Sequence, residues 1–231
     1  MTTPLFLTLA AYAAGAVPSA FWVGRFLYGK DLRTLGSCNL GATNVFRVLG
    51  WRPAAVVMVA DVFKGFAPVW WFPGLDGQEA AVWPVIYGAA AIVGHVYSFW
   101  VGFKGGKGVA TSGGVLIAMA PMVALAGLGA WLLTMLATRT VSVASMAAAL
   151  AVGILGVVMP DFDLPVRVFL GFIAVFVIWA HRSNIRRLLA GTEPRVGGGS
   201  GDDGGGEDGS GGDDDAGGED GSGGDDGGES P

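Results

Sequence analysis

Six long apolar runs decide what this chain can fold into. They cover residues 4–23, 54–72, 80–101, 111–137, 141–159 and 164–180. Each is close to the length of about 20 residues that a helix needs to cross a hydrocarbon core of about 30 Å. Overall, 52% of the residues are hydrophobic and only 14% are charged, which is too apolar for an ordinary soluble domain. The sequence therefore predicts an all-α fold, a polytopic integral membrane helical bundle.

Basic residues are concentrated in three of the segments between these runs. Residues 24–53 carry five Lys or Arg against Asp31, residues 102–110 carry Lys104 and Lys107, and residues 181–195 carry four arginines. The positive-inside rule places these segments in the cytoplasm and the N-terminus outside. The first run lacks a basic n-region and a compact cleavage site, so we interpret it as a retained span and not as a cleaved signal.

The number of spans is left open by hydropathy. Three apolar runs lie between the loop of Lys104 and the basic C-terminal segment, but two cytoplasmic ends require an even number. Either the run 111–137 divides near Pro121, which gives seven spans, or two runs merge, which gives five. Both interpretations keep the N-terminus outside.

The chain divides into two parts of opposite charge. Residues 1–196 have a net charge of +7 and form the predicted membrane domain. Residues 197–231 hold 12 acidic residues and 17 glycines without a Lys or Arg, a composition that predicts a disordered cytoplasmic tail. One cysteine and two histidines argue against a disulfide framework, a Cys-cluster metal site and a His-rich metal centre. We also expect no cofactor and no nucleic-acid partner.

The first polar motif is the segment 36–47, Gly-Ser-Cys-Asn-Leu-Gly-Ala-Thr-Asn-Val-Phe-Arg. Glycines allow a ligand to approach the backbone closely, and an arginine fork binds phosphate or carboxylate in a bidentate manner. The segment therefore favours a tight loop around an anionic head group. Its candidate ligands are Ser37, Asn39, Thr43, Asn44 and Arg47. A polar surface loop with a topogenic arginine is the alternative.

The second motif is the glycine-rich segment 103–111, Phe-Lys-Gly-Gly-Lys-Gly-Val-Ala-Thr. Backbone amides and the positive end of the following helix would add to the lysine charges and favour a phosphate. Its candidates are Lys104, Gly105, Gly106 and Lys107. It is not a Walker loop, because Val101 and Gly108 stand where that pattern needs Gly and Ser or Thr. A flexible basic hairpin is the alternative.

The remaining candidates are a third motif and three ionisable residues in apolar surroundings. His181 and Asn184 would share one face if the last helix continues inward, although a plain interface anchor has the same composition. Asp61 and Lys64 lie inside an apolar run at i, i+3 spacing, which indicates either a functional role or a mutually neutralising pair. His95 is either a packing residue or part of the site. No Ser-His-Asp set, Cys-His set or H-x4-D pair is present, which favours a substrate that arrives already activated.

Taken together, the segments 36–47, 61–65, 94–111 and 181–193 resemble the bacterial membrane acyl-phosphate:glycerol-3-phosphate acyltransferase family, in the same order and over about residues 4–195. The resemblance implies transfer of a fatty acyl group from acyl phosphate to the sn-1 hydroxyl of glycerol 3-phosphate. The products would be lysophosphatidic acid and phosphate, in phospholipid biosynthesis. It also implies seven spans in the bacterial inner membrane, a site facing the cytoplasm, and no need for a metal or coenzyme A.

The same resemblance assigns roles to residues of this chain. It implies that Ser37, His181 and Asn184 order the reacting groups. From their ionisable side chains in apolar surroundings, we expect Asp61, Lys64 and His95 to support the site. The phosphate-binding residues would be Asn39, Thr43, Asn44, Arg47, Lys104, Gly105, Gly106 and Lys107. The chain departs from the family pattern at Cys38, where Gly is usual, at Ala180, where Arg is usual, and near 98–99, where Pro-Val is usual. A side chain at position 38 leads us to expect a negative φ there.

We expect a ternary complex without an acyl-enzyme, since acyl phosphate is a mixed anhydride whose phosphate leaves readily. Either a substrate phosphate, with a second pKa of about 6, or His181 would act as the base. A transporter of a small organic phosphate is the alternative function, although only Asp61 and Lys64 supply the polar residues that it needs within the spans. A non-catalytic scaffold would leave the first two motifs unexplained. The oligomeric state is not predicted.

Overall fold

The computed structural model describes residues 2–77, 80 and 82–197, and every regular element within these residues is a helix. The described helices belong to one compact unit, Met1–Gly198. The predicted acidic tail lies outside the described residues except for Gly197. The helices in chain order are α1 (Thr2–Ala16), α2 (Ser19–Trp22), the π-helix η1 (Val23–Leu27), α3 (Ala42–Leu49), α4 (Trp51–Trp71), α5 (Pro73–Asp76), α6 (Val82–Val96), the 3₁₀-helix η2 (Phe99–Val101), α7 (Val109–Met119), α8 (Pro121–Thr138), α9 (Val141–Val158), α10 (Leu164–Ala180) and α11 (Arg182–Leu189).

The predicted polytopic membrane fold is confirmed. Five helical segments are long and apolar enough to cross a membrane, and a sixth arises if α10 and α11, bent by 52°, count as one span. The apolar run 111–137 divides at Pro121, as one of the two interpretations required, because α7 ends at Met119 and α8 begins at the proline. With 11 residues, α7 rises only about 16 Å and is too short to cross alone.

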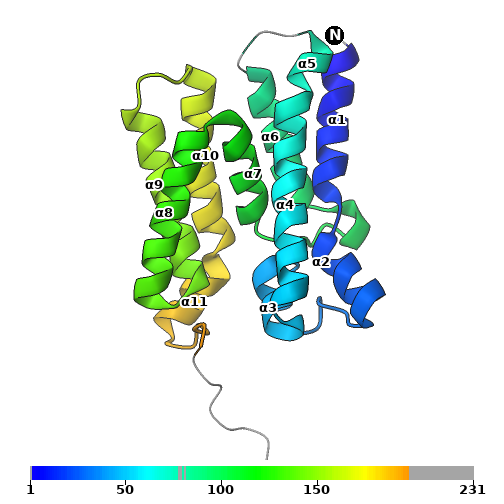
Figure 1. The fold of residues 1–231 in the computed structure, drawn as a ribbon, viewed down its shortest axis with the longest axis vertical. Coiled ribbons are helices and arrows are strands. Elements are labelled where there is room, and N and C mark those ends of the chain that lie inside the picture. Colours follow the sequence, from blue (N-terminus) through cyan, green and yellow to red (C-terminus); the bar gives the residue numbers. More distant parts are fainter. Residues whose placement is uncertain (1, 78–79, 81, 198–231) are drawn as a thin grey trace, which may run out of the picture. The chain divides into compact units, whose positions relative to one another are not determined.

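Glycines bring the helices of the N-terminal half into close contact in two pairs, α1 with α6 and α4 with α7 (Figure 1). A Cβ at Gly94 would lie 2.2 Å from the Tyr12 carbonyl oxygen, and one at Gly65 would lie 2.1 Å from the Thr111 carbonyl oxygen. Small residues of this kind let helix backbones approach, which is how helices associate in lipid. Helices α8, α9 and α10 pack consecutively against each other in the other half.

A break in the first span is stabilised by side chains from other helices. Helix α1 ends at Ala16 and α2 begins at Ser19, with Pro18, which has no backbone N–H, between them. The Ser98 hydroxyl donates to the Ala16 carbonyl, and the Lys64 ammonium donates to the Val17 carbonyl over 2.8 Å. Polar side chains inside the bundle therefore satisfy a backbone that could not remain open in lipid.

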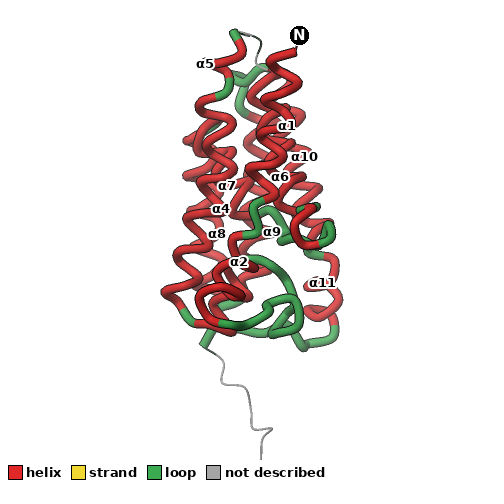
Figure 2. Tube along the Cα trace, turned by 90° about the vertical axis from the view of Figure 1, so that its right-hand side faces the viewer, coloured by secondary structure: helices red, strands yellow, loops and turns green. Residues whose placement is uncertain are grey.

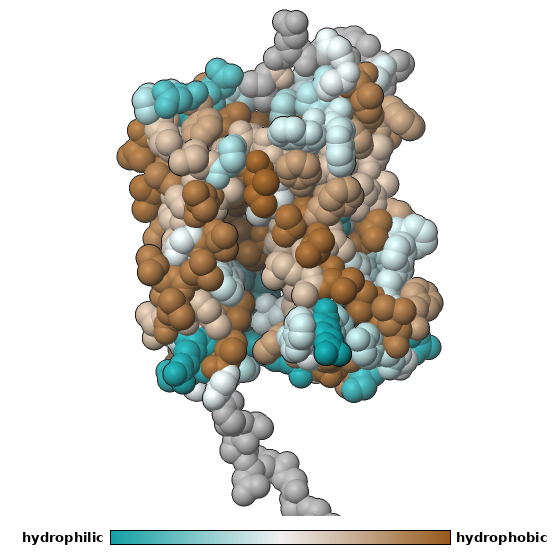
Figure 3. All heavy atoms as spheres, in the orientation of Figure 1, coloured by the Kyte–Doolittle hydropathy of each residue, from teal (hydrophilic) through white to brown (hydrophobic). Residues whose placement is uncertain are grey.

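Loops and hydrophilic residues gather at the ends of the bundle. Figure 2 shows the longest loops at the end that carries α2 and α11, opposite the N-terminus. Figure 3 shows hydrophobic residues over the middle of the visible face and hydrophilic ones near its two ends. Most exposed large side chains of α8 are leucines, as expected for contact with lipid. The loop-bearing end holds all three segments that the sequence singled out as basic.

Candidate active site

The first motif forms a loop that is held by Asn44 of α3. The Ser37 backbone N–H donates to Asn44 Oδ1 over 2.8 Å, and Asn44 Nδ2 donates to the carbonyls of Leu35, at 3.0 Å, and Leu32, at 3.3 Å. Gly36 adopts a φ of +61°, and a Cβ there would lie 2.4 Å from Asn44 Oδ1. The buried amide of Asn44 therefore organises the loop, and its donors and acceptor are engaged by backbone.

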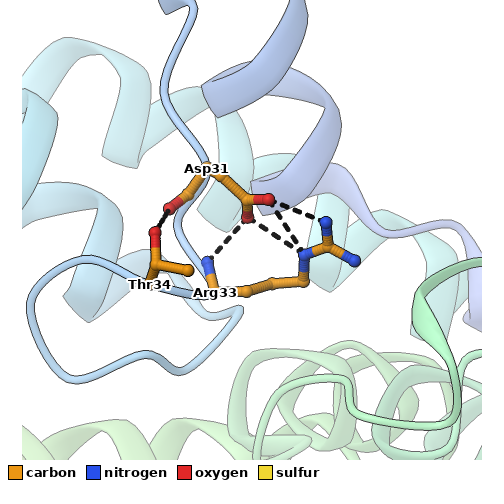
Figure 4. Close-up of polar contacts among 3 residues, drawn as sticks. All are labelled: Asp31, Arg33 and Thr34. Carbon is orange, nitrogen blue, oxygen red and sulfur yellow. Dashed lines mark hydrogen bonds and ion pairs between the residues drawn. The ribbon is translucent and has the colours of Figure 1, made fainter.

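A local ion pair fixes the entrance to this loop (Figure 4). The Arg33 guanidinium donates to both carboxylate oxygens of Asp31, with the shortest distance at 2.7 Å, and the Thr34 hydroxyl donates to the Asp31 carbonyl. Hydrogen bonds from the side chain and backbone of Arg33 lower the pKa of Asp31 to about 2. The pair is solvent-exposed, so its contribution is to the local turn and not to a buried site.

The other candidates of the first motif occupy different positions around the loop. Ser37 is exposed, Asn39 and Thr43 are half-buried, and Arg47 is exposed on α3. Cys38 has a φ of +57°, so the expectation of a negative φ is wrong. Its backbone lies in the left-handed region, which the Gly usual at this position tolerates better than a residue with a Cβ. The hydrogen bond from the Cys38 N–H to the Leu35 carbonyl belongs to the turn that imposes this conformation.

The second motif folds back onto the end of α6. The Gly105 N–H donates to the Val96 carbonyl over 2.9 Å, and the Gly106 N–H donates to the His95 carbonyl over 3.3 Å. A Cβ at Gly105 would lie 1.9 Å from the His95 carbonyl oxygen, and one at Gly106 would lie 2.2 Å from His95 Nε2. Only glycine fits at both positions, because the loop lies directly against the buried His95.

Asp61 and Lys64 form the ion pair that their spacing suggested. Lys64 Nζ lies 2.8 Å from Asp61 Oδ1, which also accepts a 2.5 Å hydrogen bond from the Ser19 hydroxyl, and His95 Nδ1 lies 3.7 Å from the same oxygen. A small cavity of about 10 Å³ beside this cluster is lined in part by Lys64, His95 and Gly106. The cluster therefore lies beneath the glycine-rich loop.

The third motif joins α11 to the glycine-rich loop. Lys107 Nζ donates to Asn184 Oδ1, and Asn184 Nδ2 donates to Glu193 Oε1 over 2.6 Å. The same carboxylate accepts from the Ser142 hydroxyl of α9 and from Arg187 Nε, each at 2.7 Å. Glu193 is a residue that the sequence analysis did not single out, although it is the one acidic residue of the basic segment 181–195.

His181 ends α10 at the bend that precedes α11. Its Nδ1 lies 2.8 Å from the Val177 carbonyl, which can only accept, so Nδ1 carries the hydrogen and Nε2 is left as the acceptor. His181 and Asn184 are both buried, as expected if they belong to one site, but the 52° bend replaces the continuous helix on which a shared face was predicted.

The charges around Lys107 converge from three segments. Burial lowers the pKa of Lys107 to about 8; nearby Glu193 opposes this shift, and nearby Arg187 and Arg47 add to it. Burial raises the pKa of Glu193, but hydrogen bonds from Asn184, Ser142 and Arg187 outweigh it, so the net shift is downward. Arg47 of the first motif therefore lies within electrostatic reach of Lys107 in the second motif.

A cavity of about 460 Å³ lies where the three motifs meet. One part of its lining is polar and cationic: Asn39, Lys104, Gly105, Gly106, Lys107, Arg182, Ser183 and Arg186. The other part is largely apolar: Val96, Tyr97, Phe103, Trp179 and Ala180. None of these lining residues is acidic, so the cavity suits an anion attached to an apolar group.

The cavity contains some of the predicted site residues and not others. Five of them line it: Asn39, Lys104, Gly105, Gly106 and Lys107. Asn184 reaches it only through Lys107, and Ser37, Thr43, Asn44, Arg47 and His181 are not part of its wall. Arg182, Ser183 and Arg186 are lining residues that were not predicted as site residues. Among the residues that the structure describes, no group of three or more His, Cys, Asp or Glu side chains could hold a metal ion.

Known proteins resemble this chain over most of its length. Residues 5–191 match the family described as glycerol-3-phosphate acyltransferase. The glycerol-3-phosphate acyltransferase of Listeria monocytogenes serovar 1/2a is 43% identical over 196 residues, which cover 83% of this chain and 96% of the relative. That of Synechococcus sp. strain JA-3-3Ab is 47% identical over 194 residues, which cover 84% and 93%.

Solved structures agree with this relation. The glycerol 3-phosphate form of PlsY, an integral membrane glycerol 3-phosphate acyltransferase, matches with a TM-score of 0.78 and 39% identity over 84% of this chain and 96% of that chain. Its lysophosphatidic acid form matches with a TM-score of 0.75 and 37% identity over 84% and 95%.

Fold and cavity together define a multi-pass membrane protein with a cationic pocket at its loop-bearing end. The chain belongs to the glycerol-3-phosphate acyltransferase family. The predicted resemblance is thereby confirmed, and with it the prediction of an enzyme that acylates glycerol 3-phosphate. The transporter alternative is set aside by the same finding.

Proposed function

We propose that this enzyme transfers an acyl group from acyl phosphate to the sn-1 hydroxyl of glycerol 3-phosphate, giving lysophosphatidic acid and inorganic phosphate. The observation that carries the proposal is the cavity of about 460 Å³, whose cationic and apolar walls meet at the glycine-rich loop. Relatives with bound glycerol 3-phosphate and lysophosphatidic acid support the acceptor and the product. Acyl phosphate as the donor fits a cavity whose wall includes Lys104, Lys107 and two arginines, which can neutralise the phosphates of donor and acceptor.

The proposed roles follow from where each side chain lies. Lys104 and Lys107 bind substrate phosphate from the glycine-rich loop, and Gly105 and Gly106 let the phosphate approach the backbone. Arg47 adds charge from α3, while Asn39 and Thr43 supply polar contacts at the first motif. Asn44 acts indirectly, since its amide holds the loop of Ser37 in place.

Asn184 is the proposed link between phosphate binding and the C-terminal segment. It accepts a hydrogen bond from Lys107 and donates one to Glu193, so its amide orientation is fixed from both sides. Lys107 is therefore held toward α11 from a loop that otherwise has few side chains to restrain it. Asp61, Lys64 and His95 support the loop from beneath, because His95 packs directly under Gly106.

The proposed mechanism needs no covalent acyl-enzyme. Acyl phosphate is already activated, so the protein contributes by holding hydroxyl and carbonyl in reacting geometry and by neutralising the departing phosphate. We favour a substrate phosphate as the base, because His181 does not line the cavity. Replacing His181 with Gln should then lower kcat only a few-fold, whereas a loss of about a thousandfold would assign the base to His181.

The proposed orientation places the cavity in the cytoplasm of a bacterial inner membrane. The three basic segments lie at the loop-bearing end together with the cavity, and the N-terminus lies at the other end (Figure 2). Accessibility of Cys38 to a membrane-impermeant thiol reagent checks this orientation, because the exposed thiol stands in the first motif. Labelling of inverted vesicles and protection in intact cells are the expected results; the reverse pattern would place the site outside.

The donor is tested with purified enzyme in detergent or nanodiscs. Labelled glycerol 3-phosphate is incubated with palmitoyl phosphate or with palmitoyl-coenzyme A, and lysophosphatidic acid is separated and counted. Product from acyl phosphate alone is expected. Product from the thioester at an equal or higher rate would refute the proposed donor while leaving the acyltransferase assignment intact.

A further inference from the structure

Three aromatic side chains form a ladder along one face of α10. The rings of Phe172 and Phe176 are stacked with centroids 5.8 Å apart, and the Phe176 and Trp179 rings follow at 6.0 Å. Positions i, i+4 and i+7 lie on the same side of a helix, which explains how one ring reaches the next. We call Phe172, Phe176 and Trp179 the aromatic ladder.

One end of the aromatic ladder is part of the cavity. Trp179 lines the cavity beside Tyr97 and Phe103, which belong to its apolar wall. The Phe176 ring reaches the glycine-rich loop, because a Cβ at Gly108 would lie 3.6 Å from Phe176 Cε1. The ladder therefore begins where the proposed phosphate-binding loop ends.

The other end of the aromatic ladder is exposed on the outer surface of the helix bundle. The Phe172 side chain is 53% exposed, and Val93 on the neighbouring helix α6 is exposed as well. Seven residues of helix separate Trp179 from Phe172, which corresponds to about 10 Å of apolar surface. The ladder thus leads from the cavity to the lipid-facing side of α10.

The aromatic ladder differs from another ring cluster on an exposed helix face in that it reaches the cavity. On α4, Phe66 and Trp70 are stacked with centroids 5.5 Å apart, but neither of them lines the cavity. The exposed large hydrophobic side chains of α8 are leucines and Met122, and those of α10 beside the ladder include Val168 and Val175. Stacked rings occur on α10 only at the edge that continues the apolar wall of the cavity. A rigid aromatic wall suits an extended hydrocarbon chain. Each aromatic side chain has only two rotatable bonds, so little side-chain entropy is lost when the ring packs against the chain.

We propose that the aromatic ladder guides the acyl chain of the donor out of the cavity and that Phe172 determines the preference for long chains. This inference rests on the proposed function, in which the donor phosphate lies at the glycine-rich loop. From there the chain must pass the apolar wall, which includes Trp179, and the Phe176 ring lies next to that of Trp179 in the ladder. A short chain ends before Phe172, whereas a long chain lies against it.

The test compares two donors of different chain length in the full-length enzyme in nanodiscs. Phe172→Ala should lower kcat/KM for palmitoyl phosphate about fivefold, from lost dispersion contacts with a few methylene groups, and leave kcat/KM for butyryl phosphate unchanged. Phe63→Ala is the matched control, because Phe63 on α4 is 56% exposed and lies outside the cavity. That variant should keep wild-type values with both donors.

Each outcome decides the inference. Equal losses with both donors, or an unchanged value for palmitoyl phosphate, would overturn it. Phe172→Leu provides a second variant that keeps the volume in case the alanine variant folds poorly, and it should show a smaller loss in the same direction. If the wild-type enzyme uses acyl-coenzyme A and not acyl phosphate, the proposed donor fails; butyryl- and palmitoyl-coenzyme A then give the same comparison, since the ladder contacts the chain and not the leaving group.

Discussion

The lowered pKa of Lys107 predicts that the enzyme loses activity at alkaline pH. With an arginine at this position, the enzyme should keep its activity over the same pH range. The ammonium form of Lys107 binds phosphate, and burial brings its pKa down to about 8 from the usual 10.5. The binding form is therefore complete well below pH 8 and disappears as the pH rises through 8. The second pKa of a phosphate ester is about 6, so the substrate itself has stopped titrating in this range.

The size of the effect follows from one titrating group. At pH 9, about one unit above the pKa of Lys107, about one molecule in ten retains the charge, so kcat/KM for glycerol 3-phosphate should fall about tenfold from its value at pH 7. The pH dependence of kcat/KM reports the pKa values of the free enzyme. The fall therefore remains visible even if bound substrate raises the pKa of Lys107. Lys107→Arg should be less active at pH 7, because the guanidinium group differs in shape from the ammonium group. Its kcat/KM should stay nearly constant up to pH 9.5, because arginine keeps its charge.

The stability of the fold should depend on pH in the direction opposite to that of the activity. Folded Lys107 releases its proton before the unfolded chain does, so its contribution to stability increases between about pH 8 and 10.5. Thermal unfolding recorded at each pH therefore separates loss of charge from loss of fold. The reasoning would be refuted by a wild-type profile that stays flat to pH 9.5, or by the same alkaline limb in the arginine variant.

Three further substitutions test the packing around the site. Gly106→Ala should abolish most activity, because its Cβ would lie 2.2 Å from His95 Nε2 and 2.9 Å from the Leu40 carbonyl oxygen. His95→Ala in the same chain removes the first of these contacts and should restore part of the activity, measured as product formed per folded enzyme; full wild-type activity of Gly106→Ala alone would contradict the tight packing. Asp61→Leu should destabilise the fold by about 3–5 kcal/mol, seen in thermal unfolding, because Lys64 is left buried and unpaired. Cys38→Gly should stabilise it by about 1 kcal/mol by relieving a positive φ, and an unchanged melting temperature would contradict this.

Hydropathy and charge were sufficient to predict the membrane bundle because both operate over whole segments. The run 111–137 illustrates what limits them: a parity argument required a division or a merger, and only the structure showed that Pro121 begins a new helix. Helix α7 is too short to be recognised as a span by its length. It packs against α4 and α6, so it need not cross a bilayer alone.

The motifs predicted which segments line the cavity but not what each side chain contacts. Lys104, Lys107 and Asn39 could be found from their surroundings in the sequence, because cations and amides among glycines indicate anion binding. Asn44 resembled a ligand, yet its amide is engaged by the backbone of its own loop. Glu193 could not be assigned from its neighbours, because its partner Ser142 lies 51 residues away.

Equilibrium binding of glycerol 3-phosphate tests most directly the claim that the cationic wall of the cavity holds the substrate phosphate. Labelled substrate is titrated onto the purified wild type and Lys104→Ala, with thermal unfolding as the measure of fold. The account predicts about tenfold or greater weakening in the variant, as for lost hydrogen bonds between charged groups, at an unchanged unfolding temperature. Wild-type affinity in a folded Lys104→Ala enzyme would contradict it and move the phosphate out of this cavity.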